Sequence, residues 1–270
     1  MAKQKLSLSI KLLALISYIV TMIINFLVGS TTVIGGQNTA QVSDKYANLF
    51  APAGITFTIW GVIYLALAIF LLRIFGVYKS KKKQLNDVKL AEVTKLFIAT
   101  SVLNVAWLFS WQYEIFLLSV VLMFGLLAVL IRIHAMLYGE KLSQSESIAI
   151  TLPFSLYFGW ITVASIANVT TWLASVNWNG YGLTEVSWMV IILIVGAGVA
   201  LAQTARHPDW VYLAVIVWAY AGILTKHLSR TGWDSKYPVV IITVSILLAV
   251  LSTVTFLSAI GVIKKPSETQ

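Results

Sequence analysis

Eight long apolar segments, joined by short loops that carry almost all of the charge, constrain the fold of this 270-residue chain more than any other feature. A helix that crosses a bilayer needs about 20 mostly apolar residues. We predict such helices at about residues 12–28, 55–75, 96–111, 115–136, 148–173, 186–203, 210–225 and 239–262. The sequence therefore predicts an all-α fold, a polytopic transmembrane helical bundle.

The composition excludes a soluble domain. Hydrophobic residues make up 59% of the chain and charged residues only 11%, whereas soluble domains carry about 25% charged residues. We place all 10 acidic residues in or beside loops, because a charge at the centre of a bilayer costs at least about 2.5–3.5 kcal/mol. The chain has no cysteine, which excludes disulfides, thiolate catalysis and cysteine-based metal sites.

The distribution of Lys and Arg predicts an orientation. The formal net charge is +9, and 15 of the 19 basic residues lie on the cytoplasmic side if the N-terminus is inside. The remaining bases are Lys45, Lys226, Arg230 and Lys236. We predict a multi-pass protein of a bacterial plasma membrane with both termini cytoplasmic and with no nucleic-acid partner. Two alternatives stay open: residues 186–225 form a re-entrant pair, or residues 12–28 are a cleaved signal peptide.

The titratable residues give little support for catalysis. We place His134, His207 and His227 at helix ends or in loops and expect them to be solvated, without the spacing of a metal site. The predicted membrane interior holds no carboxylate or histidine, which disfavours an ion-driven pump and an intramembrane hydrolase. No catalytic residue, metal ligand or required cofactor is predicted.

The predicted interior instead offers aromatic rings and amides. Four tryptophans lie well inside their segments: Trp60, Trp107, Trp160 and Trp218. Six others lie at segment ends, where indoles commonly anchor a protein at the membrane surface: Trp111, Trp172, Trp178, Trp188, Trp210 and Trp233. An amide in hydrocarbon needs a partner from another helix, from water or from a ligand. Asn104 and Asn168 are therefore candidates either for helix packing or for ligand binding.

Three separated motifs combine these residue types. Residues 50–64 read FAPAGITFTIWGVIY, so that a loop ends at Pro52 and Gly54 and a helix then carries Trp60 and Tyr64 on one face. Residues 103–107 read LNVAW, which puts an asparagine and a tryptophan on one helix face. Residues 157–168 read YFGWITVASIAN and carry a stripe of residues spaced four apart, Trp160, Ala164 and Asn168.

In their order and spacing, these motifs resemble the TspO/MBR family of tryptophan-rich sensory proteins and translocator proteins. The resemblance covers about residues 10–178 and implies a five-helix core over residues 1–180. Residues 181–270 would then be a C-terminal transmembrane extension of about three helices, because family members typically stop after five. The resemblance also implies a binding pocket whose ligand contacts are Trp60, Tyr64, Asn104, Trp107, Tyr157, Trp160, Ala164 and Asn168. The loop that enters this pocket would contribute Pro52, Gly54 and Phe57.

The family resemblance further implies a flat hydrophobic ligand, with a tetrapyrrole such as protoporphyrin or haem as the leading class, bound for sensing or regulation. The expected partners are the lipid bilayer and this small molecule, and a homodimer stays open. Two other functions also stay open. One is facilitated transport of an apolar small molecule, and the other is light-dependent porphyrin breakdown in which Trp60 or Trp160 is redox-active.

Overall fold

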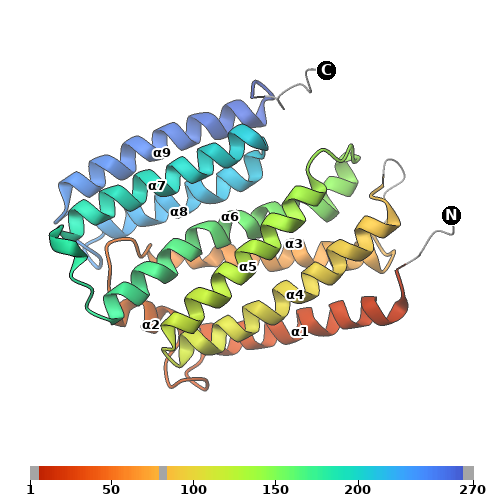
Figure 1. Cartoon of the computed structure of the whole chain (residues 1–270), viewed down its shortest axis with the longest axis horizontal. Helices are drawn as coiled ribbons and strands as arrows, with labels where there is room; N and C mark the ends of the chain where they lie inside the picture. The colour runs from red at the N-terminus through yellow and green to blue at the C-terminus, as the bar shows by residue number, and fades with distance from the viewer. Residues whose placement is uncertain (1–5, 79–83, 264–270) are drawn as a thin grey trace. The chain divides into compact units, whose positions relative to one another are not determined.

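A computed structural model describes residues 6–78 and 84–263. In this part of the chain all regular structure is helical, and eight helices are long and apolar enough to cross a membrane (Figure 1). They are α1 (Leu8–Ser30), α3 (Ile59–Ile74) with the preceding 3-10 turn η1 (Gly54–Thr58), α4 (Asp87–Gln112), α5 (Phe116–Leu137), α6 (Gln144–Ser175), α7 (Glu185–Arg206), α8 (Trp210–Leu228) and α9 (Pro238–Ala259). The shorter elements are α2 (Thr39–Lys45) and η2 (Gly180–Gly182). The predicted all-α membrane bundle is confirmed.

Several bases that predict the orientation lie outside the described residues: Lys3, Lys5, Lys79, Lys81, Lys82, Lys83, Lys264 and Lys265. The cytoplasmic placement of the termini therefore stays a prediction. Helices α7 and α8 are continuous over 22 and 19 residues, so each has the length of a full span.

Helix α4 begins well before the predicted start at residue 96. The side chain of Asn86 accepts a hydrogen bond from the backbone N–H of Val88 at 2.8 Å, which caps the helix. The placement of all acids in or beside loops is consequently wrong for Glu92, which lies in the second turn of α4 and pairs with Arg132 at 3.1 Å. An apolar window misses such polar turns because the helix extends beyond its hydrophobic stretch.

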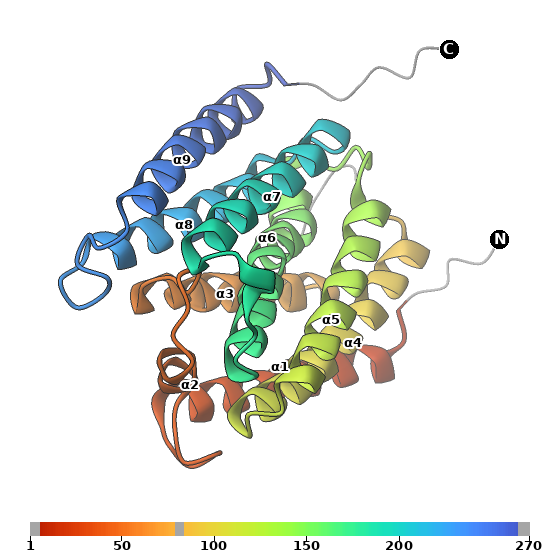
Figure 2. The ribbon, with the colours of Figure 1, turned by 60° about the vertical axis from the view of Figure 1, so that its left-hand side comes forward.

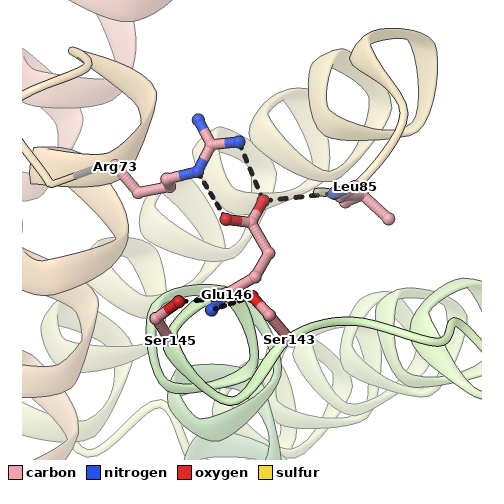
Figure 3. Close-up of polar contacts among 5 residues, drawn as sticks. All are labelled: Arg73, Leu85, Ser143, Ser145 and Glu146. Atoms are coloured by element: carbon pink, nitrogen blue, oxygen red, sulfur yellow. Dashed lines mark hydrogen bonds and ion pairs between the residues drawn. The ribbon is translucent and has the colours of Figure 1, made fainter. Parts of the chain in front are cut away.

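A buried ion pair joins the end of α3 to the first turn of α6 (Figure 3). Helix α6 begins at Gln144, so Glu146 lies in its first turn, and its side chain is fully buried. Arg73 donates two hydrogen bonds of 2.8 Å to this carboxylate, and the Leu85 N–H donates a third of 3.2 Å. Glu146 therefore lies beside a loop, as predicted, and its pairing with Arg73 compensates the cost of burying the charge.

The chain forms two compact units. The first contains residues 1–45 and 60–161, and the second contains residues 46–59 and 162–270. Helix α6 contributes its first part to one unit and its last part to the other. The division into a 1–180 core and a 181–270 extension is based on family likeness and stays a prediction.

Within the first unit, α4 packs against both α1 and α5 (Figure 1). Three phenylalanines, one each from α3, α4 and α6, form an edge-to-face core. Phe70 lies 5.4 Å from Phe97 and 5.1 Å from Phe154 between ring centroids. Such pairs contribute about 0.5–1.5 kcal/mol beyond the area that they bury.

Within the second unit, α9 packs along α7 and α8, and both views show these three helices side by side (Figure 2). Tyr220 of α8 donates a hydrogen bond of 2.7 Å to the Leu193 carbonyl of α7. The approach is close because position 196 is glycine: a Cβ there would lie 2.9 Å from the Tyr220 hydroxyl oxygen. Small residues permit this kind of helix contact in membranes.

Helix α8 also holds the chain segment 46–59. The Ala53 N–H donates to the Gly222 carbonyl at 3.0 Å, and the Trp218 indole N–H donates to the Thr56 carbonyl at 2.9 Å. The His227 Nε2 donates to the Leu49 carbonyl at 2.9 Å. Backbone carbonyls that are buried away from water need such donors.

The expectation of solvated histidines is wrong at two of the three positions. His227 is fully buried, and its hydrogen bond to the Leu49 carbonyl compensates the loss of contact with water. His134 is buried too, 5.2 Å from the Phe158 ring between centroids, and an imidazole readily packs on such a ring. His207, just after α7, is half-buried.

Candidate ligand site

The indole of Trp60 is the centre of an aromatic cluster in the first unit. Its ring centroid lies 5.4 Å from Tyr64, 6.5 Å from Trp107, 5.8 Å from Tyr157 and 6.2 Å from Trp160. Trp60 and Tyr64 are stacked with 17° between their planes, whereas Tyr157 and Trp160 meet Trp60 edge-on at 69° and 79°. We call these five residues the Trp60 cluster.

Helical spacing explains why three helices can build this cluster. Trp60 and Tyr64 are one turn apart on α3, and Tyr157 and Trp160 are one turn apart on α6, so each pair shares a helix face. Helix α4 adds Trp107 from its buried side. Trp60 is half-buried, and the other four side chains are buried. The structure thus brings together five of the predicted ligand contacts.

Asn104 joins three helices beside this cluster. Its amide nitrogen donates to the Tyr157 hydroxyl at 3.1 Å, and its carbonyl oxygen accepts from the Asn25 side chain of α1 at 3.1 Å. Asn25 also donates to the Thr21 carbonyl at 2.9 Å. Asn25 was not among the predicted site residues, although an amide in the middle of an apolar segment is the same signal that indicates Asn104.

Two polar groups of the cluster lack a hydrogen bond. Within residues 6–78 and 84–263, neither the Tyr64 hydroxyl nor the Trp107 indole N–H has a partner, and both atoms are buried. Buried polar groups in folded proteins are nearly always paired, so each exception calls for an explanation. A ligand that forms hydrogen bonds with both groups would explain these two exceptions.

The other predicted contacts belong to the second unit. Ala164 is half-buried and Asn168 is buried, both on the last part of α6. Pro52 and Phe57 are half-buried, and Gly54 is exposed, on the segment that α8 holds. Their contact with a ligand stays a prediction.

The end of α4 fixes the part of the first loop that belongs to the first unit. The Gln112 side chain donates to the backbone carbonyls of Gln37 at 2.6 Å and Ile34 at 3.3 Å. The Trp111 indole donates to the Thr39 carbonyl at 3.3 Å, and this side chain is buried. The prediction that Trp111 anchors the protein at the membrane surface is wrong, because its side chain is buried and its indole N–H donates to a backbone carbonyl of the loop.

Replacement of Asn104 should destabilise the protein by about 1 kcal/mol, the usual range for a side-chain hydrogen bond between membrane helices. We expect Asn104→Leu to lower the free energy of unfolding in mixed detergent micelles, since Asn25 and Tyr157 each lose the hydrogen bond that they make with Asn104. Tyr157→Phe removes only one of the two bonds and should cost less. Equal stability of Asn104→Leu and the natural protein would contradict the bridging role.

The fold and the cluster define a polytopic helical membrane protein whose interior carries a set of aromatic rings around one indole. The sequence matches the protein family described as TSPO-like protein over residues 11–257, and the chain belongs to that family. The match includes residues of the predicted extension. Among curated proteins and among solved structures, no match was found.

Proposed function

We propose that this TSPO-like protein binds a flat hydrophobic ligand at the Trp60 cluster, for sensing or regulation, and that the ligand is a tetrapyrrole. One observation carries the proposal: two buried polar groups without partners, on Tyr64 and Trp107, lie within a cluster of five aromatic side chains. Aromatic walls with few polar groups are typical of ligand pockets.

The proposed ligand replaces contacts between the rings. Trp60 and Trp107 are the most widely separated pair around the central indole, at 6.5 Å with 30° between their planes. A flat molecule that enters here exchanges ring–ring stacking for ring–ligand stacking, which costs little aromatic contact. It also gains hydrogen bonds, because the Trp107 N–H needs an acceptor and the Tyr64 hydroxyl takes either role.

The cluster contains no histidine, lysine or arginine. Lys45, the last residue of α2 in the first loop, is paired with Glu114 at 2.6 Å. Stacking and neutral hydrogen bonds therefore supply the affinity, and pairing with ligand carboxylates does not. We expect protoporphyrin IX and haem to bind with similar affinity, since no histidine is present in the cluster to favour the iron form.

The test is a titration of protoporphyrin IX into the purified protein in lipid nanodiscs, followed by porphyrin fluorescence. Trp60→Ala removes four ring contacts and should weaken binding at least tenfold. Trp107→Phe should weaken binding about threefold and lower the melting temperature only through the smaller ring, because its N–H has no partner to lose within the described residues. Trp210→Ala, at an exposed tryptophan of α8, is the matched control and should bind normally. Unchanged affinity in Trp60→Ala would show that the Trp60 cluster packs helices together and does not bind the porphyrin.

A further inference from the structure

The second unit contains a cavity that the proposed function does not use. It has a volume of about 570 Å³, within the range of roughly 300–1,000 Å³ that is usual for small-molecule sites. Its walls come from residues 47–50, from the end of α6, from the connection between α6 and α7, and from the first turns of α7. No residue of the Trp60 cluster lines it.

The lining of the cavity contains both buried apolar and exposed polar side chains. Leu49, Phe50 and Met189 are buried and form apolar wall. Asn177, Asn179 and Glu185 also line the cavity and are exposed. A ligand that matches both regions has an apolar body and one polar end.

Two tryptophans form the aromatic wall, Trp178 and Trp188, with ring centroids 5.0 Å apart and 55° between their planes. Trp188 is fixed because its indole N–H donates to the Gly180 carbonyl at 2.7 Å. Gly180 has φ +65°, and a Cβ there would lie 3.0 Å from the Trp188 nitrogen, so this turn needs glycine. From the sequence, both tryptophans are predicted to be membrane-surface anchors.

The charge of the lining has one sign. Glu185 is acidic, and no lysine, arginine or histidine is among the residues that the structure places around the cavity. Glu185 also has no basic partner among the described ion pairs. A carboxylate and two indoles that line the same cavity favour a cation, because the carboxylate attracts it by Coulomb interaction and the face of an indole ring carries partial negative charge.

We propose that this cavity is a second binding site, which takes a small amphipathic organic cation. The apolar body of the cation packs on Leu49, Phe50 and Met189, and its positive group lies between the indoles and Glu185. The site is independent of the proposed tetrapyrrole site, because the two share no residue and favour ligands of different charge.

Tetraphenylphosphonium and tetraphenylborate provide the test, since they have nearly the same size and shape but opposite charge. Each is dialysed to equilibrium against the full-length protein in zwitterionic nanodiscs, with empty nanodiscs subtracted. We expect saturable binding of the phosphonium at one site per chain, and none of the borate. Glu185→Gln should weaken phosphonium binding at least threefold, and Trp178→Ala at least fivefold.

Matched controls separate the site from general effects. Glu92→Gln changes another carboxylate and Trp210→Ala another indole, and both should bind the phosphonium like the natural protein. Glu185→Gln alters an exposed side chain and should keep the melting temperature and protoporphyrin binding, so it tests the site even if Trp178→Ala folds poorly. Equal saturable binding of both probes, unchanged binding in Glu185→Gln, or loss of phosphonium binding in Trp60→Ala would each overturn the proposal.

Discussion

Arg73→Met is expected to lower the free energy of unfolding by about 3–5 kcal/mol, the usual cost of leaving one partner of a buried ion pair uncompensated. The Glu146 carboxylate has no exposed surface, and of the three hydrogen bonds that it receives within residues 6–78 and 84–263, two come from Arg73 (Figure 3). Without the guanidinium, the carboxylate must stay charged in a dry environment or take up a proton. Reversible unfolding in mixed detergent micelles, followed by circular dichroism, measures the loss.

Two controls isolate the buried charge. The double variant Arg73→Met with Glu146→Gln removes both charges and keeps an acceptor for the Leu85 N–H, so it should recover most of the lost stability. Arg132→Met makes the same substitution in an exposed pair, whose side chains are 62% and 46% accessible, and should cost less than about 1 kcal/mol. Equal losses in Arg73→Met and Arg132→Met would show that burial of the pair does not matter.

Gly222→Ala is expected to destabilise the protein by about 2–3 kcal/mol, near the upper end of typical overpacking costs. A Cβ at this position would lie 2.0 Å from the Thr56 Oγ1 and 2.7 Å from its Cγ2. Alanine would therefore push η1 away from α8 and weaken the hydrogen bonds that Ala53 and Thr56 make with this helix. The melting temperature and the midpoint of chemical unfolding should both fall.

Thr56→Ala should rescue this variant in part, because it deletes the two side-chain atoms that the new methyl group meets first. Gly198→Ala is the matched control on α7, since nothing lies within 4 Å of a Cβ there. It should leave stability unchanged or raise it by up to about 1 kcal/mol, as alanine favours helix over glycine. A Gly222→Ala protein as stable as Gly198→Ala would show that η1 moves aside freely.

Local spacing predicted much of the cluster but not its long-range partners. One helical turn separates Trp60 from Tyr64 and Tyr157 from Trp160, so a shared face follows from the sequence alone. The bond between Asn25 and Asn104 joins residues 79 positions apart. Hydrophobic periodicity carries no information on such pairings, because they depend on which helices become neighbours.

Hydrophobicity also predicted the eight spans better than their ends. Capping at Asn86 extends α4 through residues as polar as Glu92, which no apolar window includes. Indoles at segment ends were equally ambiguous, because Trp111, Trp178 and Trp188 look in sequence like membrane-surface anchors. Their hydrogen bonds to loop carbonyls, or their place on a cavity wall, depend on loop conformations that side-chain patterns do not specify.

The dependence of the segment 46–59 on α8 has a consequence for biosynthesis. The hydrogen bond between Leu49 and His227 spans 178 residues. At a synthesis rate of ~5–20 residues per second, Leu49 is synthesised about 10–35 s before His227. During this interval the carbonyls of the segment depend on water or on an insertion factor, and a nascent chain stalled before α8 exposes them. Final maturation of the first loop is therefore among the last events in the assembly of the protein.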